Sequence, residues 1–223
     1  MFLTKVELAV VPTRQMPRLS AMPRVQPSQA RSKERVEAIY EATRRILRRA
    51  GVEEVTVGNI AEEAGFTAAS VYRYFSDAQA IITSLALTTL DELHREMEVA
   101  YAQIRSVEDL DPVLTAAFHH YVQRFKDDRA LRELWCGTLV SHDLISLNIA
   151  DSRRNGALMA RTIAPFSGEP VDVLSQRCFL LAQLIGAGVG LLLEVPEDEA
   201  ATLESELSRV VGLALARPAS VAS

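Results

Sequence analysis

The segment TVGNIAEEAGFTAASVYRYF, which begins at Thr56, constrains the fold more than any other part of the chain. Thr56 can cap a short helix, because its hydroxyl oxygen accepts an unpaired backbone N–H at the helix start. Gly65 can end that helix, because glycine adopts a left-handed turn at low cost. Thr67 can cap a second helix, on which Val71 and Phe75 lie four residues apart and can pack inward. Two short helices joined by a tight turn are typical of a helix-turn-helix.

A longer amphipathic helix is predicted immediately before this segment, over Ser32–Ala50. Residues that can face a core recur at the spacing of an α-helix, and arginines occupy the opposite face. Gly51 then ends the helix. The pattern therefore predicts three consecutive helices, in which the first braces the two short ones. The core-facing positions are Val36, Ile39, Tyr40, Thr43, Ile46, Leu47 and Ala50.

These three helices, over roughly residues 34–82, resemble the TetR family of bacterial transcriptional regulators. The resemblance is carried by Thr56-Val57 with Ile60-Ala61, by Ala64-Gly65, and by Ser70-Val71-Tyr72 through Tyr74-Phe75. It implies that the second short helix reads DNA, with apolar residues that anchor it and polar side chains that reach bases and phosphates. The predicted DNA-binding residues are Thr56, Thr67, Ala68, Ala69, Ser70, Tyr72, Arg73 and Tyr74.

Two departures from the family pattern each remove a cation. Ala78 stands where the family often has a lysine that holds a phosphate. Thr67-Ala68-Ala69 stands where the family often has Ser-Lys-Gly or a similar sequence. The departures weaken the expected phosphate contact and leave the expected fold unchanged.

The charge of the chain is unevenly distributed. The whole chain of 223 residues has a net charge of −5, but residues 1–75 carry 12 Lys+Arg against 8 Asp+Glu, and residues 76–223 carry 12 against 21. A basic front on an acidic body suits an N-terminal DNA reader, although chance asymmetry plus a basic tail would give the same sums. We expect three parts: a flexible basic arm at 1–30, a helix-turn-helix domain at 31–76, and a ligand-binding and dimerisation domain at 77–223. The arm either contacts DNA or is only a tail.

The predicted fold class is all-α, with about nine helices as the resemblance implies. After Phe75 the pattern is helical throughout, and no strand-like alternation of useful length occurs. Proline and glycine residues support several boundaries. The expected helices of this second part span residues 77–104, 111–127, 129–146, 148–165, 170–194 and 198–216.

The last two of these helices are predicted to form a dimer surface. The stretch Leu180–Leu193 is apolar nearly all round, so more than one side must be covered. Its glycines lower helix stability, which suggests a close approach of backbones. TetR-like proteins dimerise through their last two helices, and the alternative is that both helices only fill the monomer's core. The predicted interface residues are Leu184, Gly188, Leu191, Leu207 and Val211.

A ligand site is predicted among the middle helices, where aromatic side chains gather. A pocket between bundle helices is a common small-molecule site, and the resemblance implies an effector cavity in this region. Core packing is the alternative for each residue. The aromatic character favours an apolar or amphipathic organic effector over a phosphorylated one. The candidate residues are Phe118, Tyr121, Trp135, Cys136, Leu139 and Phe179.

Other kinds of chemistry lack support in the sequence. Cys136 and Cys178 have no metal-binding spacing, so no metal site and no cofactor are predicted. No motif of hydrolases or nucleotide-binding proteins occurs, so no catalytic residue is predicted. The apolar run Cys178–Leu193 is short for a membrane span and contains Gln183, which favours a buried interface helix and no membrane partner. A cytoplasmic location is expected.

The leading hypothesis is a ligand-responsive transcriptional repressor. A homodimer would bind a near-palindromic operator in double-stranded DNA and would be released by a small-molecule effector. One alternative is a helical binding or interaction module without sequence-specific DNA binding. A small α-helical enzyme is a further alternative, for which the sequence offers no chemistry. Salt-dependent binding to promoter DNA separates the first hypothesis from the others.

Overall fold

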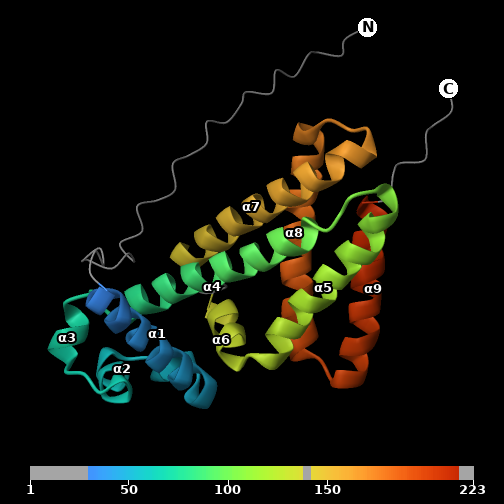
Figure 1. Ribbon diagram of the computed structural model, residues 1–223. Coiled ribbons are helices and arrows are strands. Elements are labelled where there is room, and N and C mark those ends of the chain that lie inside the picture. The colour runs from blue at the N-terminus through green and yellow to red at the C-terminus, as the bar shows by residue number, and fades with distance from the viewer. Residues whose placement is uncertain (1–29, 138–141, 216–223) are drawn as a thin grey trace, which may run out of the picture.

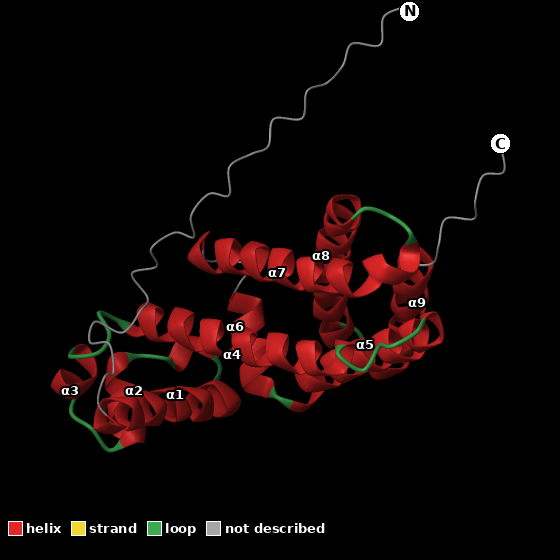
Figure 2. Ribbon diagram, turned by 45° about the horizontal axis from the view of Figure 1, so that its top comes forward, coloured by secondary structure: helices red, strands yellow, loops and turns green. Residues whose placement is uncertain are grey.

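A computed structural model describes residues 30–137 and 142–215 of the chain. These described ranges contain nine α-helices and no strand, which confirms the all-α prediction (Figure 2). Short 3₁₀ turns at Val52–Glu54 and Val107–Asp109 precede α2 and α5. The helices are α1 Ala30–Ala50, α2 Val57–Ala64, α3 Ala68–Tyr72, α4 Ala78–Tyr101, α5 Leu110–Asp127, α6 Arg129–Gly137, α7 His142–Ser167, α8 Val171–Glu194 and α9 Glu197–Leu215.

The first three helices form a small cluster at one end of the molecule, and α4 leads from it into a larger helical body (Figure 1). The cluster is held together by a core to which α1, α2 and α3 each contribute, including the fully buried Ile39, Ile60 and Val71. Ile81 and Leu85 of α4 belong to the same core, so the cluster is packed onto the start of α4. This burial orients α3 with respect to the body.

The predicted helix caps around the turn are present. The Thr56 hydroxyl accepts the backbone N–H of Asn59 at 3.1 Å, and the Thr67 hydroxyl accepts that of Ser70 at 3.3 Å. Gly65 ends α2 with φ of 71°, a left-handed conformation that a residue with a Cβ rarely adopts. The caps satisfy backbone groups that would otherwise lack partners, so the local sequence alone specifies this turn.

One predicted helix boundary is wrong. The sequence analysis placed the break between two middle helices near residue 147, but residue 147 lies inside α7, which spans His142–Ser167. Pro165, expected to end a helix, lies inside the last turn of α7. The predicted arm at residues 1–30 lies outside the described residues except for Ala30, with which α1 begins.

Helix α8 is the one described helix that is long and apolar enough to cross a membrane by length and composition. Only 28% of its apolar window is buried inside the chain. Core helices of other folds meet the same criterion, so this is weak evidence for a membrane span.

The body depends on a close crossing of α7 and α8. A Cβ added at Gly156 of α7 would lie 2.5 Å from the backbone nitrogen of Phe179 in α8. Gly156 itself is buried, and next to it lies the buried Cys178, whose thiol pKa is raised to about 11 by burial. Backbone atoms cannot move aside as a flexible side chain can, so this position requires glycine.

We predict that Gly156→Ala destabilises the protein by about 1–3 kcal/mol, because the added methyl overpacks two backbones. The matched control is Gly212→Ala in α9, where nothing lies within 4 Å of an added Cβ. That change should stabilise the fold by about 0.5–1 kcal/mol through helix propensity. Urea denaturation followed by circular dichroism compares the two, and equal stabilities would contradict the crossing.

Candidate functional site

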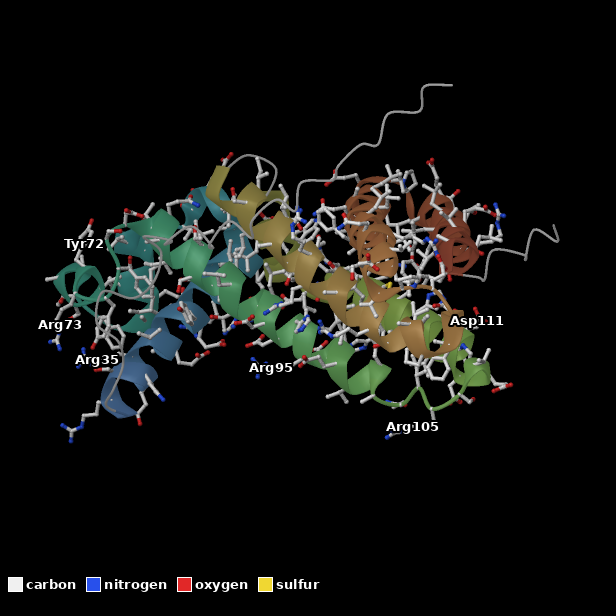
Figure 3. All side chains as sticks on the ribbon, turned by 90° about the horizontal axis from the view of Figure 1, so that it is seen from above. Arg35, Tyr72, Arg73, Arg95, Arg105 and Asp111 are labelled. Atoms are coloured by element: carbon white, nitrogen blue, oxygen red, sulfur yellow. The ribbon has the colours of Figure 1, made fainter. Side chains whose placement is uncertain are left out.

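Helix α3 presents an exposed, polar surface at the free end of the N-terminal cluster. Tyr72 is 51% exposed and Arg73 is also exposed, and both project from this end of the molecule in Figure 3. Thr56, Thr67, Ala68 and Ala69 are exposed as well, and Ser70 is half-buried. Seven of the eight residues predicted to bind DNA are therefore at least partly accessible, and we call the accessible residues of Thr67–Arg73 the α3 surface.

Tyr74 is a correction to the predicted set. Its side chain is 3% exposed and belongs to the core shared by α1, α2, α3 and α4. The Arg73 guanidinium lies 5.7 Å from the centre of its ring. Tyr74 follows the end of α3, where the chain turns back toward the core, so helical spacing alone could not show its direction. We assign Tyr74 to packing beneath the α3 surface.

Arg35 adds a cation that the sequence analysis left on the solvent face of the first helix. Its guanidinium lies 5.2 Å from the centre of the Phe66 ring, which stands in the turn between α2 and α3. Arg35 is exposed and lies at the same end of the molecule as Tyr72 and Arg73 (Figure 3). The sequence features that could have indicated this contact are an arginine early in the first helix and an aromatic residue in the turn.

The rear of the helix-turn-helix is held by arginines of α1. Arg45 and Arg49 both donate to the Glu63 carboxylate of α2, at 2.6 and 3.0 Å. These hydrogen bonds lower the pKa of Glu63. The arginines on this face are therefore engaged in bracing α2, unlike Arg73 and Arg35, which have no salt bridge among the described residues.

A cavity lies inside the helical body, between α4, α5, α6, α7, α8 and α9. Its volume is about 50 Å³, and Phe118, Tyr121 and Trp135 line it as the sequence predicted. A second cavity of about 290 Å³ adjoins it at the end of the bundle and shares Leu114 and Phe118 with it. The inner cavity holds little more than a water molecule in this conformation. A larger ligand must therefore displace lining side chains or extend into the outer cavity.

Of the other predicted ligand residues, Phe179 has a described side chain, and it lines neither cavity. Phe179 is a correction: it faces the α7–α8 crossing, where the Arg153 guanidinium lies 4.4 Å from its ring centre. An aromatic residue on α8 can face α7 or the cavity, and only packing decides between them. Leu139 lies outside the described residues, and nothing of the Cys136 side chain is described.

The sequence analysis missed the polar side of the inner cavity, which α7 supplies. Asp151, Ser152 and Asn155 all line it. The Asp151 carboxylate accepts from Arg154 Nη2 at 2.9 Å and from Asn155 Nδ2 at 2.8 Å. Burial raises the pKa of Asp151, against the opposing effect of Arg154. Nothing in the sequence marked these residues, because polar side chains on a long helix are usually solvated.

Tyrosine hydroxyls complete this polar side. Tyr101 of α4 and Tyr121 of α5 line the cavity. Burial raises the pKa of both phenols, and the charge of Asp151 adds to the effect at Tyr121. Both hydroxyls are therefore protonated at neutral pH and can donate a hydrogen bond.

Helix α6 connects the cavity to the N-terminal cluster. Trp135 packs edge-on against Phe125, with ring centres 5.3 Å apart, and forms part of the cavity wall. Two residues before Trp135, the Glu133 carboxylate accepts the backbone N–H of Val52 at 3.2 Å. Val52 follows directly after the end of α1. The salt bridge between Arg48 of α1 and Asp128, 3.1 Å long, adds a second link beside it. A displacement of α6 would thus reach α1.

The predicted dimer residues divide into two groups. Leu184 and Leu191 are 49% and 52% exposed, on the outer face of α8. Gly188 instead faces α9 of its own chain, because an added Cβ would lie 2.5 Å from Leu207 Cδ2. Val211 lines both cavities. The close approach expected at Gly188 is therefore real, but it joins two helices of one chain.

Metal binding finds no support in the described ranges, where no group of three or more His, Cys, Asp or Glu residues could hold an ion. His119 and His120 point to different partners, Glu204 on α9 and Glu96 on α4, each at 2.9 Å. Adjacent residues on a helix face different directions, so this separation is expected.

The geometry defines a class of protein in which a helix-turn-helix domain is joined to a helical body that contains a cavity. Two family models match the chain. "Bacterial regulatory proteins, tetR family" matches residues 39–85, and "Tetracyclin repressor-like, C-terminal domain" matches residues 108–219. The chain belongs to the TetR family. Its members are DNA-binding transcriptional regulators with a ligand-binding domain, and not enzymes.

Solved structures of the same fold share little sequence with this chain. A transcriptional regulator from Cytophaga hutchinsonii has a TM-score of 0.64 and 16% identity, and the alignment covers 81% of this chain and 96% of that one. FadR from Bacillus halodurans, a regulator of fatty acid degradation, has a TM-score of 0.61 and 14% identity, and the alignment covers 82% of this chain and 95% of that one. FadR from Thermus thermophilus, solved with lauroyl-CoA, has a TM-score of 0.60 and 18% identity, with 84% of this chain and 98% of that one covered. A comparison with curated proteins gives no match.

We predict that two nearby tyrosines of the helix-turn-helix differ strongly in their contribution to stability. Tyr74→Ala should destabilise the protein by about 3–5 kcal/mol, because it removes a buried ring from the N-terminal core. Tyr72→Ala should change the stability by at most about 0.5 kcal/mol, because that ring is half exposed and at the surface. Thermal melting followed by circular dichroism measures both, and a large loss for Tyr72→Ala would contradict the orientation of α3.

Proposed function

We propose that the protein is a homodimeric repressor that binds a near-palindromic operator and is released by a small apolar or amphipathic effector. The observation that carries the proposal is that one short helix, α6, connects the cavity wall to the base of the helix-turn-helix. Trp135 supplies the first contact and Glu133 supplies the second. We assign DNA binding to residues 31–76, ligand binding and dimerisation to residues 77–223, and a basic arm to residues 1–30. A cytoplasmic location fits operator binding.

The α3 surface has the groups that operator binding needs. The Tyr72 hydroxyl can donate to a phosphate, and the Arg73 guanidinium can reach a phosphate or a guanine edge. Arg35 adds positive charge beside them. Exposed Ala68 and Ala69 at the start of α3 allow its N-terminus to approach the DNA backbone closely. The lysines missing from the family pattern are thus partly replaced by arginines of α1 and α3.

The dimer is proposed from an apolar stripe on the outside of α8. Val173, Leu180, Leu184 and Leu191 are all 44% or more exposed, and they recur at intervals of seven, four and seven residues. Val210 and Leu213 of α9, the following helix, are exposed as well. A stripe at this spacing is typical of helices that pack against other helices. Two copies related by a two-fold axis would cover it and would place two α3 surfaces on successive major grooves.

Release by an effector follows from the small size of the inner cavity. A ligand that enters must displace part of its wall, and Trp135 belongs to that wall. Movement of α6 would disturb the contacts of Glu133 and Asp128 with the end of α1. The effector must bind this displaced state more tightly than the DNA-binding state, or it shifts nothing. The organic ligand of Thermus thermophilus FadR supports an organic effector in general, without naming it.

DNA binding is tested on the α3 surface. Tyr72→Phe should weaken binding about 2- to 10-fold, because one hydrogen bond to phosphate is lost. Arg73→Ala should weaken it more and should reduce the salt dependence of binding. Arg95→Ala removes the same charge from the exposed side of α4, away from α3, and serves as the control (Figure 3). Mobility shifts on an operator selected from random DNA measure all three. Absence of salt-dependent DNA binding by the wild type would favour the interaction-module alternative.

The dimer is tested on the apolar stripe of α8. Leu184→Glu should convert the dimer to monomers of 24.5 kDa, because it buries an unpaired charge in the interface. Val99→Glu is the control, since Val99 is 69% exposed on α4. Sedimentation at micromolar concentration gives the mass, and circular dichroism checks the fold. A monomeric wild type would refute the proposal that a homodimer places two α3 surfaces on the DNA. Gly188→Leu would be a poor test, because it disturbs the α8–α9 packing of one chain.

A further inference from the structure

Apolar side chains such as Leu114, Phe118 and Met159 form most of the lining of the two adjoining cavities. The outer cavity also has polar residues in its wall, namely Asp111, Thr115, Ser167 and Ser208. In the inner cavity α7 contributes Asp151, Ser152 and Asn155. A ligand in the inner cavity would therefore meet polar groups on its α7 side.

The charged side chains in the lining are acidic. Among the described residues that line either cavity there is no lysine, arginine or histidine, and the charged ones are Asp151 and Asp111. Arg154 donates to Asp151, to Asp91 and to the Leu90 carbonyl, but it does not line either cavity. An anionic group of a ligand would thus lose water and gain no cation.

Two of the polar groups retain capacity for hydrogen bonds. Each Asp151 oxygen accepts one hydrogen bond within the chain, whereas a carboxylate offers about four lone-pair sites. Tyr121 lines the same cavity, and within the described residues its hydroxyl makes no hydrogen bond. The charge of Asp151 adds to the rise in the pKa of Tyr121, so the two groups lie near each other. A ligand could therefore donate to the Asp151 carboxylate and pair with the Tyr121 hydroxyl.

We propose that the cavity selects a neutral or cationic small molecule that has an apolar ring system and a hydrogen-bond donor, such as a hydroxyl or amine, directed at Asp151 and Tyr121. The inference rests on the effector-binding function proposed above and narrows the chemical class of the effector. Carboxylates, phosphates and acyl-CoA thioesters should bind poorly, because no described residue in either lining is a cation.

The volumes set the size of this molecule. A cavity of about 150 Å³ in another protein accepts benzene. The outer cavity of about 290 Å³ therefore suits a ring system of about two fused rings, whose donor reaches the inner cavity past Phe118. Phe118 lines both cavities, so it stands where the two meet.

Four naphthalene derivatives of matched size test the selection: 2-naphthol, 2-naphthylmethylamine, 2-methylnaphthalene and 2-naphthoate. Isothermal titration calorimetry of the full-length protein should show that the hydroxyl and amine compounds bind at least about tenfold more tightly than the methyl and carboxylate compounds. Equal or tighter binding of 2-naphthoate, or no binding of any of the four, would overturn the inference.

Three variants identify the groups responsible. Asp151→Asn should remove the preference for the amine and relieve the exclusion of 2-naphthoate. Asp91→Asn is its matched control, because Asp91 bonds to the same Arg154 but lies outside both cavities. Tyr121→Phe should weaken the binding of 2-naphthol several-fold and leave the binding of 2-methylnaphthalene unchanged. A preference that survives in Asp151→Asn, or that is lost equally in Asp91→Asn, contradicts the role of the carboxylate.

A parallel measurement on selected operator DNA keeps the two proposals apart. Salt-dependent DNA binding without the predicted order of the four compounds would refute the ligand class alone. The predicted order without DNA binding would refute the repressor alone and leave the ligand class supported. If both hold, addition of 2-naphthol should lower operator affinity in the wild type and have less effect in Asp151→Asn.

Discussion

The rest of the structure depends on the packing of the Trp135 indole. The indole lies between α5 and α8: its ring is 5.3 Å from that of Phe125, and a Cβ at Gly186 would lie 2.9 Å from it. Glycine at 186 leaves the space that the indole fills, so α6 can lie close to α8. The same side chain packs against both the N-terminal core and the core of the body. Because close-packed interiors deform in discrete steps, a ligand that moves this ring moves a helix.

Polar contacts between the N-terminal cluster and the helical body are weaker than this packing. They serve to orient the cluster relative to the body. Burial has the largest single effect on the pKa of Asp128 and raises it, but the hydrogen bonds and charge of Arg48, the Ala130 backbone N–H and the charge of Arg124 together lower it. The side chain of Arg48 is 47% exposed, so the free energy of this salt bridge is modest. Weak polar contacts beside a strong apolar one suit a joint that must change its angle. The link between Glu133 and Val52 has the same character, because it uses one backbone N–H.

The fold does not determine the ligand. Relatives with TM-scores of 0.58 to 0.60 were solved with ligands as different as lauroyl-CoA and resorcinol. Chemistry therefore resides in the side chains that each chain places around its cavity. In this chain those side chains are mostly apolar, and the charged ones among the described residues are Asp151 in the inner cavity and Asp111 in the outer one.

Local sequence by itself determined the helix-turn-helix of this protein, because Thr56, Gly65 and Thr67 act on backbone groups only a few residues away. Periodicity likewise determined the all-α class and most helix boundaries. Tertiary structure decided which face of each helix is buried. It buried Tyr74, turned Phe179 toward α7 and Gly188 toward α9, and brought Asp151 into the lining of the inner cavity. These outcomes depend on residues far apart in the chain, so spacing along one helix could not reveal them.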